Sequence, residues 1–363
     1  EVSRQGSWLG RGRPSLVRAV RFYWARRIKR RLFLRTAIAW AWIYRNFDKI
    51  IAVSMTFLLY ALIVKLGTCD IHMKPEDAVP VSFLRCNSSR SIVVASRFWA
   101  HTPSDLRKLD GFIRDTEEAV SHRLCVLLVA INDAEDQHQT DAHLKDMGQA
   151  FPRLESWSVS PWTITTPLNA MLERARKLGA KYILYLSVEV HLDEDHLNAL
   201  LHVMDDSTFV AGVALPGHRR MEKLRSPSSQ NIKVHCGDTI SSSLEGDTIP
   251  WNTLAIWRTD ELARTGFLND ADRQKPPGME EAVPIALLQQ MIKANGPRRA
   301  KLVHFEGDYQ PNWNVKFESE ERMQKQALKM ASKRFRTTQQ LTTAGVQGEV
   351  NHLLYCFNNA SKI

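Results

Sequence analysis

The chain has 363 residues, of which 44% are hydrophobic and 24% charged, and this composition is typical of a folded globular protein. It excludes a wholly disordered chain. The formal net charge is +10, but residues 1–49 alone carry 11 Arg and two Lys against Glu1 and Asp48. The remaining residues hold 36 basic and 37 acidic side chains. The positive charge therefore belongs to the tail, and we expect no nucleic-acid partner for the main domain.

An uncharged apolar segment follows the basic tail. Residues 50–64 contain no charged side chain and are flanked by Lys49 and Lys65. A spanning helix needs about 17–25 residues, and flanking lysines can snorkel to the interface. We predict a transmembrane helix over residues 50–67, with a buried core helix as the alternative. The positive-inside rule then places residues 1–49 in the cytosol.

The five cysteines are widely spaced and form no Cys-x-x-Cys pair, so neither a zinc site nor a thioredoxin-like motif is indicated. A disulfide between Cys69 and Cys86 is possible in an oxidising compartment, although spacing alone cannot establish it. Cys125 lies in an apolar run and is interpreted as a core residue.

Residues 68–90, which contain two prolines, are interpreted as a stem. Beyond them, short apolar runs alternate with segments of helical period. The predicted strands are residues 91–96, 124–131, 182–186, 209–215 and 302–305. A helix is expected over 168–178, with Gly179 ending it, and another over 197–204. This alternation predicts an α/β domain with a mostly parallel sheet.

Polar residues follow three of the predicted strands. Ser96 and Arg97 come after the first, Asp133 after the second, and Ser187 and Glu189 after the third. Ligands of open parallel sheets lie at the carboxyl ends of the strands. An aspartate there can accept from a base or ribose, and a glutamate oxygen suits Mg²⁺ or Mn²⁺. These residues predict a site for a nucleotide donor.

With these segments in order, residues 91–305 resemble the GT-A fold of nucleotide-sugar glycosyltransferases, most of all the family 2 group. The most specific part is 166–204, where the family's metal-binding Asp-x-Asp falls on Ser187 and Glu189. The resemblance implies Mn²⁺ or Mg²⁺ at Glu189. His191 and His304 are further candidate ligands. Because a serine replaces one aspartate, the need for a metal stays open.

A literal Asp-x-Asp occurs slightly later, at Asp193 and Asp195. Its position just before the apolar stripe of 197–204 is typical of a helix N-cap, where an aspartate accepts hydrogen bonds from free backbone N–H groups. We interpret this pair as a cap.

Two later segments extend the resemblance. Residues 249–267 resemble the family's acceptor-side strand and helix, which implies that Trp251 and Asn252 contact a sugar; core packing of Trp251 is an equal alternative. The segment from Gly278 resembles the acidic motif that supplies the general base, with Glu281 as first choice and Glu280 as second. The alternative is that these acids favour the start of a helix.

The Gln-x-x-Arg-Trp motif of the family's processive polysaccharide synthases is absent from the sequence, which favours an enzyme that adds one sugar at a time. Residues 318–336 are rich in charge and predict an exposed helix at the domain edge. The predicted parts are a basic tail (1–49), an anchor (50–67), a stem (68–90), a GT-A domain (91–317) and a C-terminal helix and tail (318–363).

The basic tail and the predicted anchor, taken together with the resemblance, predict a type II, single-pass membrane glycosyltransferase that acts in the lumen, in the Golgi, where nucleotide sugars are imported. The donor would be a nucleoside-diphosphate sugar, the acceptor a hydroxyl of a glycan, protein or lipid, and the reaction inverting. A non-catalytic relative that binds glycans or acts as a scaffold is the alternative.

Overall fold

The structure is a computed structural model, and it describes residues 85–99, 103–132, 137–224, 233–291, 298–306, 313 and 320–357. All of these lie in the unit His72–Ile363. The predicted tail, the predicted anchor, most of the stem and Asp133 lie outside the described residues. Within the described ranges, no helix is long and apolar enough to cross a membrane.

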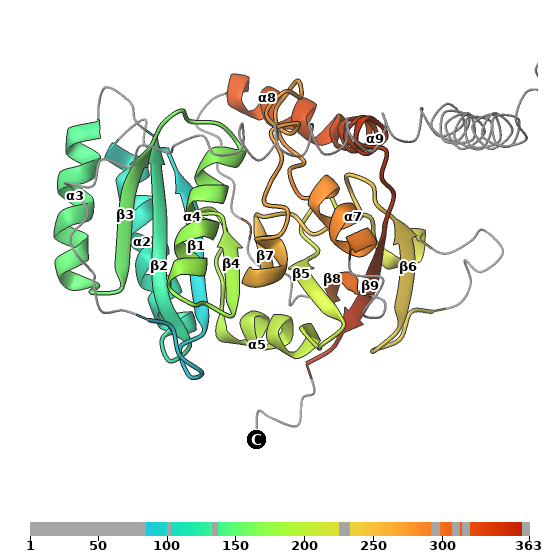
Figure 1. Cartoon of the computed structure of the whole chain (residues 1–363), viewed down its shortest axis with the longest axis horizontal. Coiled ribbons are helices and arrows are strands. Elements are labelled where there is room, and N and C mark those ends of the chain that lie inside the picture. Colours follow the sequence, from blue (N-terminus) through green and yellow to red (C-terminus); the bar gives the residue numbers. More distant parts are fainter. Residues whose placement is uncertain are drawn as a thin grey trace, which may run out of the picture. The chain divides into compact units, whose positions relative to one another are not determined.

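The described strands form one nine-stranded sheet in the order β3-β2-β1-β4-β7-β5-β8-β9-β6 (Figure 1). The strands are β1 (Ile92–Phe98), β2 (Leu124–Asn132), β3 (Leu154–Val159), β4 (Tyr182–Leu186), β5 (Thr208–Val213), β6 (Thr239–Ser243), β7 (Leu254–Arg258), β8 (Arg299–Phe305) and β9 (Glu349–Tyr355). Most neighbours are parallel, but β7 runs antiparallel between β4 and β5, and β6 runs antiparallel to β9. The predicted mostly parallel α/β sheet is confirmed.

Helices cover both faces of the sheet. They are α2 (Pro103–Val120), α3 (Gln137–Ala150), α4 (Thr165–Lys177), α5 (Glu194–Val203), α6 (Thr259–Leu262), α7 (Ala282–Met291), α8 (Glu320–Ala331) and α9 (Lys333–Ala344). Because side chains alternate along a strand, Ile92 and Val94 of β1 join the apolar cluster under α2 and α5. Val93 and Ala95 join the opposite cluster, which α4 and α7 cover. The two faces of β1 therefore serve different layers.

The ends of two predicted helices agree with the sequence. Gly179 has φ +74° just after α4, a left-handed conformation that glycine adopts without steric cost. Asp193 is the N-cap of α5, and its Oδ1 accepts from the backbone N–H of His196 at 2.8 Å. Asp195 lies in the first turn, so the local Asp-x-Asp caps a helix as predicted.

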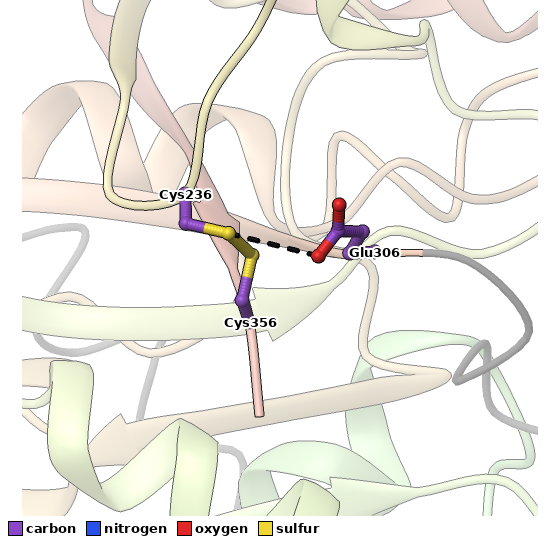
Figure 2. A group of neighbouring side chains, drawn as sticks. All are labelled: Cys236, Glu306 and Cys356. Atoms are coloured by element: carbon purple, nitrogen blue, oxygen red, sulfur yellow. Dashed lines mark hydrogen bonds between the residues drawn. A yellow bond between two sulfur atoms is a disulfide. The ribbon is translucent and has the colours of Figure 1, made fainter. Parts of the chain in front are cut away.

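The cysteines pair differently from the sequence prediction. Cys86 is bonded to Cys125, so Cys125 is a buried half-cystine and not a free core thiol. This bridge ties the end of the stem to β2. A second disulfide joins Cys236 to Cys356, just after β9 (Figure 2). Sequence spacing could not show these pairs because each joins segments that only the folded sheet brings together.

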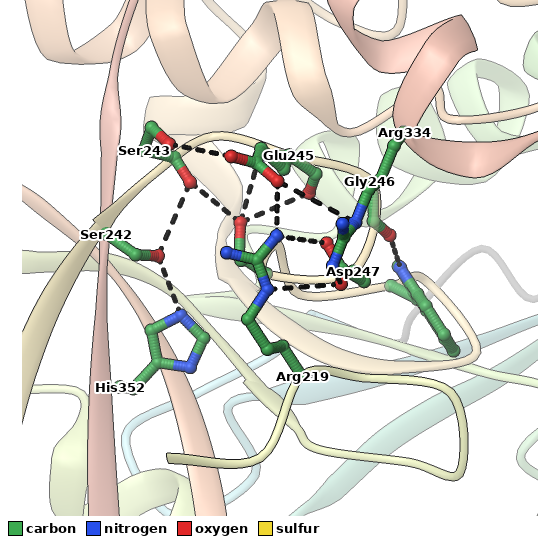
Figure 3. A network of polar contacts seen from close by, with 10 residues as sticks. Arg219, Ser242, Ser243, Glu245, Gly246, Asp247, Arg334 and His352 are labelled. Atoms are coloured by element: carbon green, nitrogen blue, oxygen red, sulfur yellow. Dashed lines mark hydrogen bonds and ion pairs between the residues drawn. The ribbon is translucent and has the colours of Figure 1, made fainter. Parts of the chain in front are cut away.

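The C-terminal region also differs from the prediction of one exposed helix and a tail. Residues 320–355 form α8, α9 and β9, and β9 lies inside the sheet between β8 and β6. His352 of β9 contacts Ser242 of β6, and Arg334 of α9 pairs with Asp247 (Figure 3). The domain therefore extends past the boundary predicted at 317. A buried histidine inside β9 weakens the apolar pattern that would have revealed this strand.

Candidate functional site

A cavity of about 650 Å³ opens at the carboxyl ends of β1 and β4. Because these strands are parallel neighbours, the residues at their ends meet at one edge of the sheet. The volume suits a ligand of nucleotide-sugar size. The cavity is lined by Ala95, Arg97, Leu168, Tyr185, Leu186, Ser187, Glu189, Asn252, Thr253, Pro276, Trp313, Gln326, Leu328 and Lys329.

Of the two residues predicted at the end of β1, only Arg97 lies at the cavity. Its Nη1 donates to the carbonyl oxygen of Ile164 at 2.9 Å, and its Nη2 lies 3.6 Å from Glu280 Oε1. Ser96 is 1% exposed and does not line the cavity, so the structure gives no support to its predicted role in donor binding. Successive side chains of a strand point to opposite faces of the sheet, so Ser96 faces the layer beneath α2.

Ser187 and Glu189 both line the cavity, as predicted. The Ser187 hydroxyl donates to Glu189 Oε2 at 3.0 Å. His191 does not join them, because its exposed side chain lies 3.1 Å from Asp115 of α2. His304 is buried elsewhere in the sheet and contacts His352 at 2.9 Å. The structure therefore corrects the suggestion that either histidine completes a cation site with Glu189.

The residues at the cavity fit a divalent cation poorly. Among the lining residues that the structure describes, Glu189 is the only carboxylate, whereas Arg97 and Lys329 are both cations. Mg²⁺ is commonly bound by one or two carboxylates together with substrate phosphates, so Glu189 is the minimum that such a site needs, and the two cations beside it oppose the ion. In the described part of the chain, Cys236, Glu306 and Cys356 are the one group close enough to share a metal, but the cysteines form a disulfide and offer no thiolate (Figure 2).

Two aromatic residues, Tyr185 and Trp313, line the cavity, whereas Trp251 does not. Trp251 is 3% exposed and its ring stacks on His218 with centroids 3.6 Å apart, so the core-packing alternative describes it. The Nε1 of Trp313 is buried and has no hydrogen-bond partner among the described residues. In the sequence, Trp313 stands out only as an aromatic residue in the polar loop that follows the predicted strand 302–305.

Asn252 lies at the cavity, as the resemblance implied. Its Oδ1 accepts from the indole N–H of Trp257 at 3.0 Å, which fixes the orientation of the amide. Its Nδ2 is buried and finds no partner within the described ranges. A fixed amide with an unused donor is suited to a hydroxyl or phosphate oxygen of a ligand.

Glu280 and Glu281 are both buried just before α7, and neither lines the cavity. Glu281 Oε1 accepts from the backbone N–H of Asn252 at 2.6 Å, directly behind the cavity wall. Burial, and next the neighbouring Glu280, raise the pKa of Glu281 above the ordinary range of a carboxyl. The preceding Met279 has φ 68°, a strained conformation for a residue with a Cβ. The acidic pair is thus held in a fixed, costly arrangement.

Helices α8 and α9 hold the loop that carries these acids. Arg336 donates to the carbonyl oxygens of Pro276, Pro277 and Lys329 at 2.7–3.3 Å. Gln340 Nε2 donates to the Gly278 carbonyl oxygen at 2.9 Å. These contacts bring α8, and with it Lys329, against the cavity. Lys329 could not be singled out from the sequence because it lies in a helix whose many charges indicate a solvated surface.

No protein family matches the chain, and no curated protein matches it. Solved structures of similar fold include a mannosyltransferase from Pyrobaculum calidifontis in complex with GDP-Man and Mn²⁺. It is 14% identical, with 80% of this chain and 74% of that chain covered and a TM-score of 0.47. GalNAc-T7 with UDP, GalNAc and Mn²⁺ is 9% identical, with 56% and 41% covered and a TM-score of 0.37.

A 4-diphosphocytidyl-2C-methyl-D-erythritol synthase is 14% identical, with 67% of this chain and 100% of that chain covered and a TM-score of 0.37. Identities this low carry no residue roles over to the present chain. The mixed α/β architecture itself fits the GT-A fold that the sequence resembles.

Proposed function

We propose that this protein is a glycosyltransferase that moves a sugar from a nucleoside-diphosphate donor to an acceptor hydroxyl. The observation that carries this proposal is the cavity at the carboxyl ends of β1 and β4. It combines cations for a diphosphate with an aromatic ring and a fixed amide for sugar hydroxyls. A glycan, a protein or a lipid could supply the acceptor hydroxyl.

In the proposed reaction the acceptor oxygen attacks C1 of the donor sugar and forms the new glycosidic bond. The bond from C1 to the diphosphate oxygen breaks, and the nucleoside diphosphate leaves with that electron pair. Glu281 takes the hydroxyl proton, with Glu280 as the second candidate. A raised pKa makes Glu281 a stronger base than an ordinary carboxylate, although it has to reach the acceptor from behind Asn252.

We further propose that the main domain lies in the lumen of the Golgi, anchored by residues 50–67 as a type II membrane protein. Two disulfides in the described region support an oxidising compartment. Protease protection of the main domain in intact vesicles, compared with detergent-treated ones, tests this topology.

The second candidate function is a non-catalytic protein that binds glycans or acts as a scaffold. It is favoured by the position of Glu280 and Glu281, because neither carboxylate is in direct contact with the cavity. A base has to come within hydrogen-bond distance of its proton, or reach it through one water.

The two candidates are separated by incubating the full chain with UDP-, GDP- and CMP-linked sugars and a mixture of glycan acceptors. An active transferase releases the nucleotide and forms a glycoside of inverted configuration, which NMR detects. We expect Glu281→Gln to abolish transfer, whereas Glu173→Gln, an exposed carboxylate on α4, leaves it unchanged. The rate should rise with pH up to the raised pKa of Glu281, because only the unprotonated carboxylate accepts a proton. Glycan binding without turnover would favour the scaffold.

A further inference from the structure

The side chains that line the cavity carry more positive than negative charge, whereas the ligands of a metal site are mostly negative. Arg97 from β1 and Lys329 from α8 line it together, although 232 positions separate them in the sequence. Glu189 is the single lining carboxylate in the part of the chain that the structure describes, and it already accepts from Ser187. A concave surface with this balance attracts an anion and repels a free divalent cation.

Lys329 forms no direct ion pair within the described residues, and among nearby negative charges only those of Glu280 and Glu281 act on it. In the described ranges, its ammonium group has neither an ion pair nor a hydrogen bond. Burial, foremost, lowers the pKa of Lys329; Arg97 and Arg336 lower it further, while Glu280 and Glu281 oppose them. Partial burial of a cation that forms no ion pair is unfavourable, and an anionic ligand relieves that cost.

Arg97 supplies the second positive charge that lines the cavity. One of its terminal nitrogens is bonded to a backbone carbonyl, and the other is 3.6 Å from Glu280, so its position is fixed. Its side chain keeps 29% of its surface exposed. A guanidinium held in this way can direct further N–H groups at the oxygens of a phosphate.

We propose that Lys329 and Arg97 bind the diphosphate of the nucleotide donor directly, so that nucleotide binding needs no divalent cation. This inference rests on the proposed glycosyltransferase function and concerns the same cavity. The two side chains neutralise the diphosphate, which is the role of the metal in the family that the sequence resembles. Ser187 fits this arrangement, because an aspartate there would add a negative charge close to the diphosphate.

The test is calorimetric titration of the full chain with UDP, GDP and inorganic pyrophosphate, each in EDTA and in Mn²⁺. We expect a nucleoside diphosphate to bind in EDTA with a Kd within about threefold of that in Mn²⁺. Lys329→Met should raise this Kd by about 10-fold to 100-fold, the range for losing a charged hydrogen bond. Lys177→Met, an exposed lysine on α4, is the matched control. Pyrophosphate shows how much of the binding comes from the diphosphate alone.

Thermal unfolding of the ligand-free variants shows whether Lys329 has only a structural role. Because Lys329 is partly buried and forms no ion pair within the described residues, we expect Lys329→Met to keep or raise the Tm while it loses nucleotide affinity. A lower Tm with unchanged nucleotide affinity would overturn the proposal. Binding that requires Mn²⁺ and is insensitive to Lys329→Met would overturn it as well, and would leave the glycosyltransferase function standing. If no nucleotide binds in either buffer, both proposals fail together.

Discussion

The strand-end side of the cavity and its C-terminal side are built in different ways. Arg97, Ser187 and Glu189 lie where two parallel strands end, so the register of the sheet places them. Lys329 lies on a helix that reaches the cavity only through the contacts of Arg336 and its neighbours with a distant loop. The first side depends on local pattern, and the second on contacts between residues far apart in the sequence. Each of the following predictions tests whether the two sides are one cooperative unit.

The largest effect is expected from the disulfides, because each closes a long loop of the chain. Removing Cys86–Cys125 by alanine substitution opens a loop of 39 residues, and removing Cys236–Cys356 opens one of 120 residues. Chain entropy predicts losses of about 4 and about 5 kcal/mol in the free energy of unfolding. Urea unfolding of the two double variants measures the difference. A smaller cost for the Cys236 pair would mean that β9 detaches before the rest unfolds.

Next in size is the loss of Arg336, which is 1% exposed. Arg336→Met keeps most of the apolar stem but leaves buried carbonyl groups of the loop and α8 without donors. We expect it to lower the free energy of unfolding by about 3 kcal/mol. Arg334→Met is the control on the same helix, since its ion pair with Asp247 is largely exposed on the arginine side and should contribute less than about 1 kcal/mol. Equal effects would show that α9 is only loosely docked.

The buried histidines of β8 and β9 predict that the free energy of unfolding depends on pH. Burial lowers the pKa of His304 to about 4 and that of His352 to about 3, and both stay neutral in the folded protein. The unfolded chain takes up these protons near pH 6.5, so stability is full above that pH and falls as the pH drops toward 4. Each histidine contributes a slope of about 1.4 kcal/mol per pH unit.

Replacing both histidines by glutamine should flatten this slope in urea unfolding between pH 6.5 and 4.5. His191→Gln, an exposed histidine, is the control that should leave the slope unchanged. An unaltered slope in the double variant would show that the C-terminal strand does not hold its histidines neutral.

The smallest effect is expected from a single charge on the strand-end side. Ser187→Asp restores the second carboxylate beside Glu189 and weakens the positive balance of the cavity. We expect Mn²⁺ to improve nucleotide binding to this variant by a few-fold, about the effect of one added surface charge, while native affinity barely changes. Calorimetry in EDTA and Mn²⁺ measures it. A strong Mn²⁺ effect on the native chain would mean that the strand-end side already holds a metal.

The sequence by itself determined the central strands of the sheet, whereas β3, β6 and β9 were not predicted. Buried runs such as those of β2 and β4 are continuous and apolar, and Asp193 and Gly179 mark helix ends, so these elements follow from local chemistry. That is why the strand ends predicted Arg97, Ser187 and Glu189 at the ligand site, whereas Asn252 was implied only by the resemblance to a family.

Only the tertiary structure decided the remainder. Which face of β1 meets the cavity, and therefore whether Ser96 or Arg97 reaches it, depends on how the sheet packs. Trp251 is covered by His218, which lies 33 positions earlier in the sequence. Lys329 looks like one charge among many in its helix, and it becomes partly buried when Arg336 docks that helix on the loop before Glu280. Disulfide partners and buried charges depend on which residues are close together in the folded chain, and a local sequence pattern does not contain that information.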